Sequence, residues 1–148
     1  MNVDVLDIRE AVEADLPSIL ALYSEVGDVQ VLSTDQAHAI IERMKTYPDY
    51  HVYVATIEGA IVGTFALLIM DNLAHLGAPS GVVEDVVVSA ERQGQGIGKQ
   101  MMQFAMERCR ERCCYKMALS SNLKRDAAHR FYDSLGFERH GYSFRMIL

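Results

Sequence analysis

The sequence has neither a surplus of positive charge nor a long apolar run. Its 148 residues carry 14 Lys and Arg against 20 Asp and Glu, which gives a formal net charge of −6 at pH 7. An acidic chain is a poor candidate for general binding to nucleic acid or to membrane surfaces, because both are negatively charged. Its apolar runs are far shorter than a membrane span, and its N-terminus shows no signal-peptide pattern. We therefore expect a cytoplasmic protein.

Cysteine is scarce as well. The three cysteines are Cys109, Cys113 and Cys114, near the end of one predicted helix. An odd, clustered set makes a poor disulfide framework and suits a reducing compartment. Cys109 and Cys113 could share a helix face and bind a soft metal, but no other Cys or His lies close in sequence to complete a site. We expect partly buried thiols and no tightly bound metal.

The rest of the composition is that of an ordinary globular protein. Half of the residues are apolar and 23% are charged. A chain of 148 residues is long enough for one core, so we expect a single domain over 1–148. We find no repeat, low-complexity segment or linker.

Alternating and helical apolar patterns predict the element order β-α-α-β-β-β-α-β-α-β. That order predicts an α/β (α+β) fold, in which a mixed, mainly antiparallel central sheet is flanked by about four helices. A parallel pair is expected where a strand–helix–strand unit crosses over. The predicted strands are 3–10, 51–57, 60–70, 81–88, 116–121 and 141–148. The predicted helices run from a cap at Asp15 to a stop at Gly27, over 33–44, from the glycine-rich turn to about 112, and over 126–135.

Residues 93–99, Gln-Gly-Gln-Gly-Ile-Gly-Lys, form the glycine-rich turn. A glycine-rich turn between a strand and a helix predicts an anion site, because free N–H groups and the helix dipole both favour negative charge there. The G-x-G-x-G spacing in mid-chain is not the G-x-G-x-x-G of a dinucleotide fold, and it lacks the gap and the Lys-Ser/Thr of a Walker loop. An ordinary glycine-rich connector is the alternative.

Two segments together resemble the GNAT superfamily of acetyltransferases. Val86-Val87-Val88 followed by the glycine-rich turn resembles that superfamily's Q/R-x-x-G-x-G/A pyrophosphate loop. Residues 128–137, Ala-His-Arg-Phe-Tyr-Asp-Ser-Leu-Gly-Phe, are similar to its second cofactor segment. The resemblance covers essentially the whole chain and implies an acetyl-CoA-dependent transfer to an amine. Residues 81–88 look like glucosamine-phosphate N-acetyltransferases and residues 120–132 like aminoalkylphosphonate N-acetyltransferases, both of which acetylate small amines bearing a phosphate or phosphonate.

The resemblance also implies where acetyl-CoA binds. The N–H groups of the glycine-rich turn would take the pyrophosphate, and the main chain of Val86 to Val88 would pair with the pantetheine arm as an added strand would. We expect strands 81–88 and 116–121 to splay apart there, which leaves backbone groups that need a partner. The implied cofactor-binding residues are Val86, Val87, Val88, Gln93, Gly94, Gln95, Gly96, Ile97, Gly98, Lys99, Asn122, Arg125, Ala128 and Phe131.

Tyr132 and Glu84 are the candidate catalytic residues. The resemblance implies that Tyr132 protonates the leaving thiolate, and a phenol has a proton to give at neutral pH. A tyrosine packed on its helix with its hydroxyl at the surface is the alternative. Glu84 interrupts a Val-rich strand, where burial would raise the pKa of the carboxyl and make it a base. It could equally bind the substrate amine. Asp85 alternates to the other face unless the strand bulges.

The sequence says less about the residues that bind the acceptor amine. His75 precedes the strand 81–88 and is a candidate substrate or metal ligand, or simply an exposed histidine. The candidate substrate residues are His75, Glu84, Asp85 and Ser121. Arg125 could pair with a phosphate of the cofactor or of the substrate, and the alternative is an exposed arginine in the first helical turn. The expected partner is a small-molecule amine. The alternatives are a protein Nα or Lys acetyltransferase and a non-catalytic acetyl-CoA sensor, and the last strand could support a homodimer.

Overall fold

The computed structural model describes residues 5–26 and 30–148. By their internal contacts these residues form two compact units, Met1–Ala118 and Leu119–Leu148. The first unit contains the sheet and three of the α-helices, and the second contains the last helix. The expected start of the first strand at residue 3 and the expected helix stop at Gly27 lie outside the described residues.

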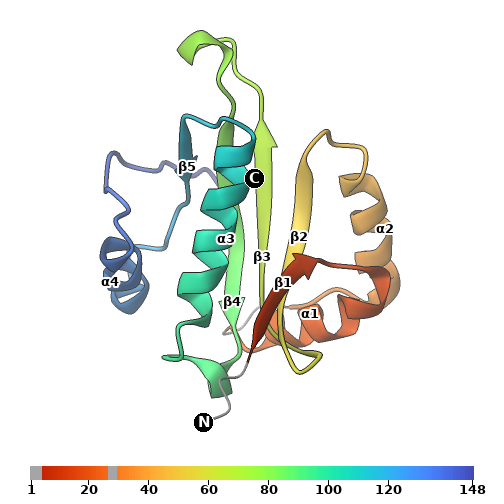
Figure 1. Ribbon diagram of the computed structural model, residues 1–148. Coiled ribbons are helices and arrows are strands. Elements are labelled where there is room, and N and C mark those ends of the chain that lie inside the picture. Colours follow the sequence, from red (N-terminus) through yellow and green to blue (C-terminus); the bar gives the residue numbers. More distant parts are fainter. Residues whose placement is uncertain (1–4, 27–29) are drawn as a thin grey trace. The chain divides into compact units, whose positions relative to one another are not determined.

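The first unit is built on a five-stranded sheet with the order β1-β2-β3-β4-β5 (Figure 1). All neighbouring strands are antiparallel except β4 and β5, which are parallel. The expected fold class, a mixed and mainly antiparallel sheet with one parallel pair, is confirmed. The strands are β1 Leu6–Glu10, β2 Tyr50–Ile57, β3 Ala60–Met70, β4 Ser80–Val88 and β5 Lys116–Ala118.

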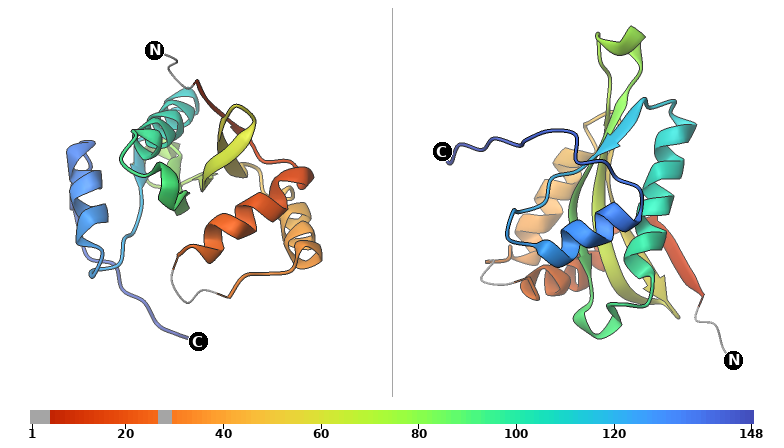
Figure 2. Two further views of the ribbon diagram at one scale, coloured as in Figure 1. Left: turned by 90° about the horizontal axis from the view of Figure 1, so that it is seen from below. Right: turned by 90° about the vertical axis from the view of Figure 1, so that its left-hand side faces the viewer.

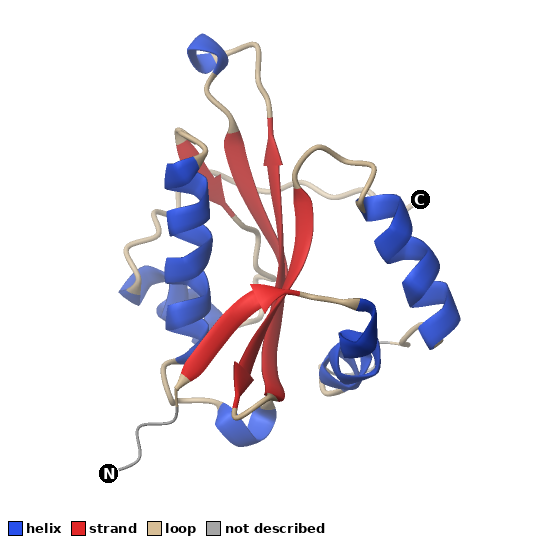
Figure 3. Ribbon diagram, turned by 45° about the vertical axis from the view of Figure 1, so that its right-hand side comes forward, coloured by secondary structure: helices blue, strands red, loops and turns tan. Residues whose placement is uncertain are grey.

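Helices cover both faces of the sheet. Two of them lie on one face and α3 lies on the other (Figures 2 and 3). The buried residues of α3 recur at the spacing of one helix face, and they are Ile97, Met101, Met102, Ala105 and Cys109. The opposite face has its own core cluster, in which the first two helices meet β2. The helices of this unit are α1 Leu16–Ser24, α2 Thr34–Met44 and α3 Ile97–Glu111.

Two glycines of the sheet set how closely α3 approaches. A Cβ atom built on Gly63 would lie 2.7 Å from Met101 Sδ, and one built on Gly81 would lie 2.4 Å from Cys109 Sγ. Both distances are shorter than real carbon–sulfur contacts, so only glycine lets the helix sit this close. The two contacts are eight residues apart along α3 and hold it flat against β3 and β4. The glycine-rich turn is thereby fixed at the end of β4.

Asp15 precedes α1 as expected, but its side chain does not cap that helix. The carboxylate instead accepts two hydrogen bonds from Arg9, at 2.7 and 3.0 Å, and one from the Val12 N–H at 2.8 Å. Pro17 occupies the first turn of α1, where a missing N–H costs nothing. The prediction that the Asp15 side chain caps α1 is therefore wrong. Its hydrogen bonds instead connect β1 to the start of α1.

The second unit contains α4, Asp126–Ser134, which ends at Gly136 in a left-handed conformation as expected. The predicted strand 141–148 is wrong, because these residues have no regular structure and are exposed. A strand needs a neighbour to satisfy its backbone groups, and alternation in the sequence cannot supply one. The strand expected over 116–121 is also shorter, since β5 ends at Ala118.

Candidate active site

The glycine-rich turn has the geometry of an anion site. Gly94 and Gly96 have φ values of 79° and 82°, in the left-handed region that favours glycine. Gly96 is the N-cap of α3, and no side chain bonds the helix start. The first intrahelical bond runs from the Gln100 N–H to the Gly96 carbonyl. The N–H groups of Ile97, Gly98 and Lys99 therefore point out of the helix end, toward any bound anion.

The entry to this turn is tied to the sheet and to α1. The Ser89 N–H donates to the Val62 carbonyl at 2.8 Å, and the Ala90 N–H donates to Glu25 Oε2 at 3.0 Å. Gln93 reaches back to the Val88 carbonyl with a long contact of 3.4 Å. The side chain of Ile97 is buried in the core, so this residue offers only its N–H group. The turn is thus anchored on both sides while Gly94 and Gly96 stay exposed.

β4 has an unpaired edge beside the turn. The parallel ladder between β4 and β5 joins Ser80 to Lys116 and ends with the pair Val82 and Ala118. Among the described residues of this unit, none pairs with Val86, Val87 or Val88 on that edge. The backbone N–H and C=O groups that face this edge can therefore bind an extended ligand as an added strand, and the Val88 carbonyl is the one that Gln93 already contacts. On the β4 side, this free edge is what the splay expected from the sequence requires.

β4 also bulges in its middle. Ala66 pairs with Glu84, but the next pair joins Thr64 to Val87, so β4 holds an extra residue. Asp85 lies in this bulge with a φ of 53°, which is uncommon for a residue other than glycine. A bulge lets neighbouring side chains depart from strict alternation, so Glu84 and Asp85 need not face opposite ways. The expected burial of Glu84 is wrong, because both carboxylates are exposed.

The charge of these carboxylates acts on two tyrosines that the sequence did not single out. Burial raises the pKa of Tyr23 to about 12, and the negative charge of Asp85 adds to the effect. Burial, followed by Asp85 and Glu84, raises the pKa of Tyr50. Tyr23 lies in the last turn of α1 and Tyr50 begins β2, so they are distant in sequence. Only the pairing of the strands and the packing of α1 bring them to the bulge.

Tyr132 lies on α4, in the second unit, among aromatic rings. Its ring centroid is 5.1 Å from that of Phe131 and 5.6 Å, edge to face, from that of Phe137. Burial raises the pKa of Tyr132, and the charge of Arg125 partly opposes the shift. The phenol is therefore protonated at neutral pH. No hydrogen bond to its hydroxyl is found in the described residues, so its proton is available.

The segment before α4 is a compact turn. The Asn122 side chain accepts from the Lys124 N–H at 2.9 Å, and the Asn122 carbonyl meets His129 Nε2 at 2.7 Å. His129 thus shapes the turn. Arg125 is exposed at the N-cap of α4, and Ala128 and Phe131 are half-buried. The Ser121 hydroxyl is buried without a hydrogen-bond partner.

His75 lies at the other end of β4 from the glycine-rich turn. It precedes β4 in an exposed loop, and its ring stacks on Tyr115 with centroids 4.1 Å apart. The nine residues of β4 separate the two ends by roughly 30 Å at about 3.3 Å per residue. The structure therefore does not bring His75 to the turn. Within residues 5–26 and 30–148, no three His, Cys, Asp or Glu side chains gather as a metal site.

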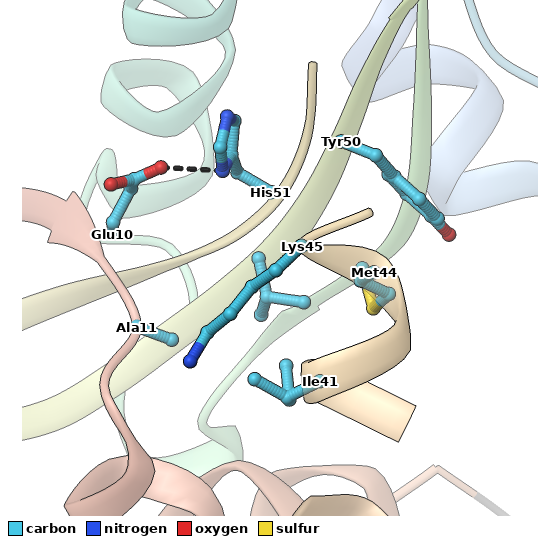
Figure 4. Close-up of a pocket in the computed structure, with 8 residues that line it drawn as sticks. Glu10, Ala11, Ile41, Met44, Lys45, Tyr50 and His51 are labelled. Atoms are coloured by element: carbon cyan, nitrogen blue, oxygen red, sulfur yellow. Dashed lines mark ion pairs between the residues drawn. The ribbon is translucent and has the colours of Figure 1, made fainter. Parts of the chain in front are cut away.

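A small cavity lies between α2 and the edge of the sheet (Figure 4). Its volume is about 180 Å³, and an ion pair of 2.5 Å between Glu10 and His51 borders it. Tyr50 is the one cavity residue that also stands beside the bulge carboxylates. The residues that line the cavity are Glu10, Ala11, Ile41, Met44, Lys45, Tyr50, His51 and Val52.

Known proteins match this chain over nearly its whole length. The family model for the acetyltransferase (GNAT) family matches residues 16–137. A glucosamine 6-phosphate N-acetyltransferase of Trypanosoma brucei brucei is 32% identical over 97% of this chain and 96% of its own. An aminoalkylphosphonate N-acetyltransferase of Salmonella typhimurium is 30% identical over 97% of this chain and 92% of its own.

Solved structures match the fold as well. A putative acetyltransferase from Agrobacterium tumefaciens superposes with a TM-score of 0.90 at 33% identity, over 96% of this chain and 99% of its own. A Trypanosoma brucei acetyltransferase superposes with a TM-score of 0.85 at 31% identity, over 97% of this chain and 100% of its own. No helix in the described residues is both long and apolar enough to cross a bilayer.

Proposed function

Because this chain belongs to the GNAT acetyltransferase family, we propose that it moves an acetyl group to the primary amine of a small molecule, directly within a ternary complex. Acetyl-CoA, the donor of this family, supplies the activated acetyl group as a thioester. The observation that carries the proposal is that the glycine-rich turn follows directly after the unpaired edge of Val86 to Val88. The turn suits a pyrophosphate, and the strand edge suits an extended amide chain.

The proposed grip on the cofactor uses mainly backbone groups. The N–H groups of residues 94–99 would hold the pyrophosphate, and those of residues 86–88 the pantetheine arm. The residues present fit such a ligand, because a Cβ atom on Gly94 or Gly96 would enter open space that a phosphate can use. We propose that Gln93, Asn122, Arg125, Ala128 and Phe131 add contacts. The family model spans both compact units, which supports treating 1–148 as one catalytic domain.

Acetyl transfer also requires two proton movements. We propose that Tyr132 gives its proton to the departing thiolate, which its raised pKa allows at neutral pH. We propose that Glu84 takes the proton of the attacking amine, directly or through a water. Its exposure supports transfer through water rather than through a desolvated carboxylate. Asp85, in the same bulge, would hold the ammonium form before it loses that proton, and Ser121 offers an unpartnered hydroxyl.

The proposed acceptor is a small amine bearing a phosphate or phosphonate. The support is similarity alone: relatives at 32% and 30% identity carry the names glucosamine 6-phosphate and aminoalkylphosphonate N-acetyltransferase. Glu84 and Asp85 belong to β4, the strand that we propose pairs with the cofactor, which supports their assignment to the acceptor site, whereas His75 precedes β4 at its other end. We therefore leave His75 out of the proposed acceptor site.

The test is turnover with acetyl-CoA and 2-aminoethylphosphonate or glucosamine 6-phosphate. Cys113 is exposed and would itself react with thiol reagents, so the acetylated amine is followed by mass spectrometry. We expect acetylation of at least one of these amines, and its loss in Glu84→Gln. Acetylation only of protein Nα or Lys amines would point to a protein acetyltransferase. Tight binding of acetyl-CoA with no acetylated product from any amine would point to a sensor.

We further propose that two copies associate in solution and that they act in the cytoplasm. The support for association is the exposed C-terminal segment, in which Tyr142, Phe144 and Met146 are 91%, 93% and 82% exposed. Alternating apolar side chains left in water are stabilised by pairing with another strand. Light scattering should give a mass near twice 16.6 kDa, and Phe144→Ser should lower it. A monomer at micromolar concentration would contradict association. The free, clustered cysteines support a reducing compartment.

A further inference from the structure

Tyr23 and Tyr50 stand on the same face of the sheet as Glu84. In the strand register, Glu84 pairs with Ala66 of β3, and Ala66 pairs with Val52 of β2. Side chains of paired residues point to one face, and residues two apart on a strand share that face. Tyr50 is two residues before Val52, so it shares the face of Glu84. Val52 packs on the core under α1 and α2, which identifies this face.

Tyr23 reaches the same place from the helix layer. It is in the last turn of α1 and packs partly buried against the core cluster that Val52 also touches. The electrostatic coupling of Tyr23 to both Asp85 and Tyr50 agrees with this placement. Three chain segments, the end of α1, the start of β2 and the bulge of β4, therefore converge. We call Tyr23, Tyr50, Glu84 and Asp85 the tyrosine–carboxylate cluster.

The polar groups of the tyrosine–carboxylate cluster are unpaired. Within the described residues, neither phenol and neither carboxylate has a side-chain hydrogen bond or ion pair. The charged groups that act on the two phenols are Asp85 and Glu84, and no cation is among them. Two carboxylates, two phenol oxygens and the faces of aromatic rings are the groups that bind an alkylammonium ion. The two carboxylates repel a phosphate.

We propose that Tyr23 and Tyr50 are specificity-determining residues of the acceptor site, which with Glu84 and Asp85 bind the ammonium group of the amine and exclude its anionic end. This inference rests on the proposed function, because it assigns residues to the same reaction. The bulge makes this arrangement possible, because it relaxes strict alternation and Asp85 then need not face away from Glu84. The acceptor would enter amine first, with a phosphate or phosphonate held away from this cluster.

The experiment compares Tyr23→Phe and Tyr50→Phe with Tyr47→Phe as a matched control. Tyr47 is 53% exposed and touches Tyr50 ring to ring at 5.5 Å, but it lies outside the tyrosine–carboxylate cluster. Losing one hydrogen bond to the ammonium group should raise the KM for the amine about 3- to 10-fold, with the KM for acetyl-CoA unchanged. Tyr47→Phe should match the unaltered protein in both constants.

Asp85→Asn tests the charge without straining the bulge, because Asn tolerates a positive φ at least as well as Asp. We expect a larger rise in the KM for the amine than either tyrosine variant gives, since a charged partner is lost. A binding test needs no turnover: 2-aminoethylphosphonate is titrated calorimetrically into the CoA-loaded protein. Its analogue 2-hydroxyethylphosphonate, which lacks the ammonium group, should bind at least about tenfold more weakly.

The outcomes separate this inference from the proposed function. If the unaltered protein acetylates no small amine, the proposed function fails and takes the inference with it. If it acetylates an amine, but Tyr23→Phe and Tyr50→Phe behave like Tyr47→Phe, the inference alone fails. Equal binding of the amine and its hydroxyl analogue would overturn it too, because the anionic end would then be the group recognised. A rise confined to the KM for acetyl-CoA would assign the tyrosines to the cofactor instead.

Discussion

Gly81 of β4 and Cys109 of α3 approach so closely that a methyl group on the glycine would lie 2.4 Å from the cysteine Sγ. This contact fixes the height of α3 above the sheet. Burial raises the pKa of the Cys109 thiol to about 12, so the thiol packs here as a neutral apolar group. The position of the helix start, and with it the glycine-rich turn, depends on such contacts.

The first prediction tests that contact. Gly81→Ala should destabilise the protein by about 1–3 kcal/mol, because the added methyl group overpacks a filled site. Cys109→Ala removes the sulfur and should restore part of the loss in the double variant. Chemical unfolding of the four proteins of the cycle gives the coupling. Strict additivity of the two single changes would show that the methyl group and the sulfur do not compete for the same space.

The second prediction concerns Tyr132. Tyr132→Phe should lower kcat by roughly tenfold or more, the lower end of general-acid effects, while acetyl-CoA affinity stays unchanged. Tyr142→Phe, at a position 91% exposed in the same unit, is the control. Because burial holds the pKa of Tyr132 above its ordinary value of 10, the unaltered enzyme should keep this acid protonated up to and beyond pH 10. An unchanged kcat with chemistry rate-limiting would remove the role.

The third prediction concerns the left-handed glycines of the turn. Gly94→Ala and Gly96→Ala should each weaken acetyl-CoA binding, because alanine pays about 1–2 kcal/mol in the left-handed region and the N–H groups then lose their common direction. The expected loss of affinity is roughly 5- to 30-fold. Gly141→Ala is the control, since Gly141 has no positive φ and no neighbour within 4 Å of an added Cβ. Equal affinities in all three variants would rule out the turn as the anion site.

The fourth prediction concerns Arg9 and Asp15. The hydrogen bond from Arg9 lowers the pKa of the Asp15 carboxyl below its ordinary value of 3.8. A lowered folded-state pKa contributes stability that is fully present above the unfolded value and is lost as the pH falls through the folded one. Asp15→Asn should therefore cost about 1 kcal/mol at pH 7, a modest figure because Arg9 is partly exposed.

The difference between Asp15→Asn and the unaltered protein should shrink once the pH falls below about 4. Urea unfolding of both proteins from pH 7 to pH 3 gives this difference directly. A gap that persists unchanged to pH 3 would show that the pair contributes through packing of the side chains rather than through charge.

Local patterns in the sequence were enough for most of the elements. The hairpin of β2 and β3 follows from two β-rich runs joined at Glu58 and Gly59, and α2 follows from Ser33, whose hydroxyl accepts the Gln36 N–H at 3.2 Å. The glycine-rich turn could be located because two of its glycines, Gly94 and Gly96, adopt φ values that other residues rarely adopt. These features depend on residues that are close together in the chain, so a sequence alone is enough to predict them.

The sequence by itself therefore determined the order of strands and helices, the glycine-rich turn, and the family to which its motifs belong. Only the tertiary structure decided that Glu84 is exposed, that β4 bulges at Asp85, that 141–148 forms no strand, and that the charge of Asp85 acts on both Tyr23 and Tyr50. The physical reason is the range of the interactions. Turn and helix preferences act within a few residues, whereas strand partners, bulges and burial depend on segments distant in sequence, whose contacts no local pattern encodes.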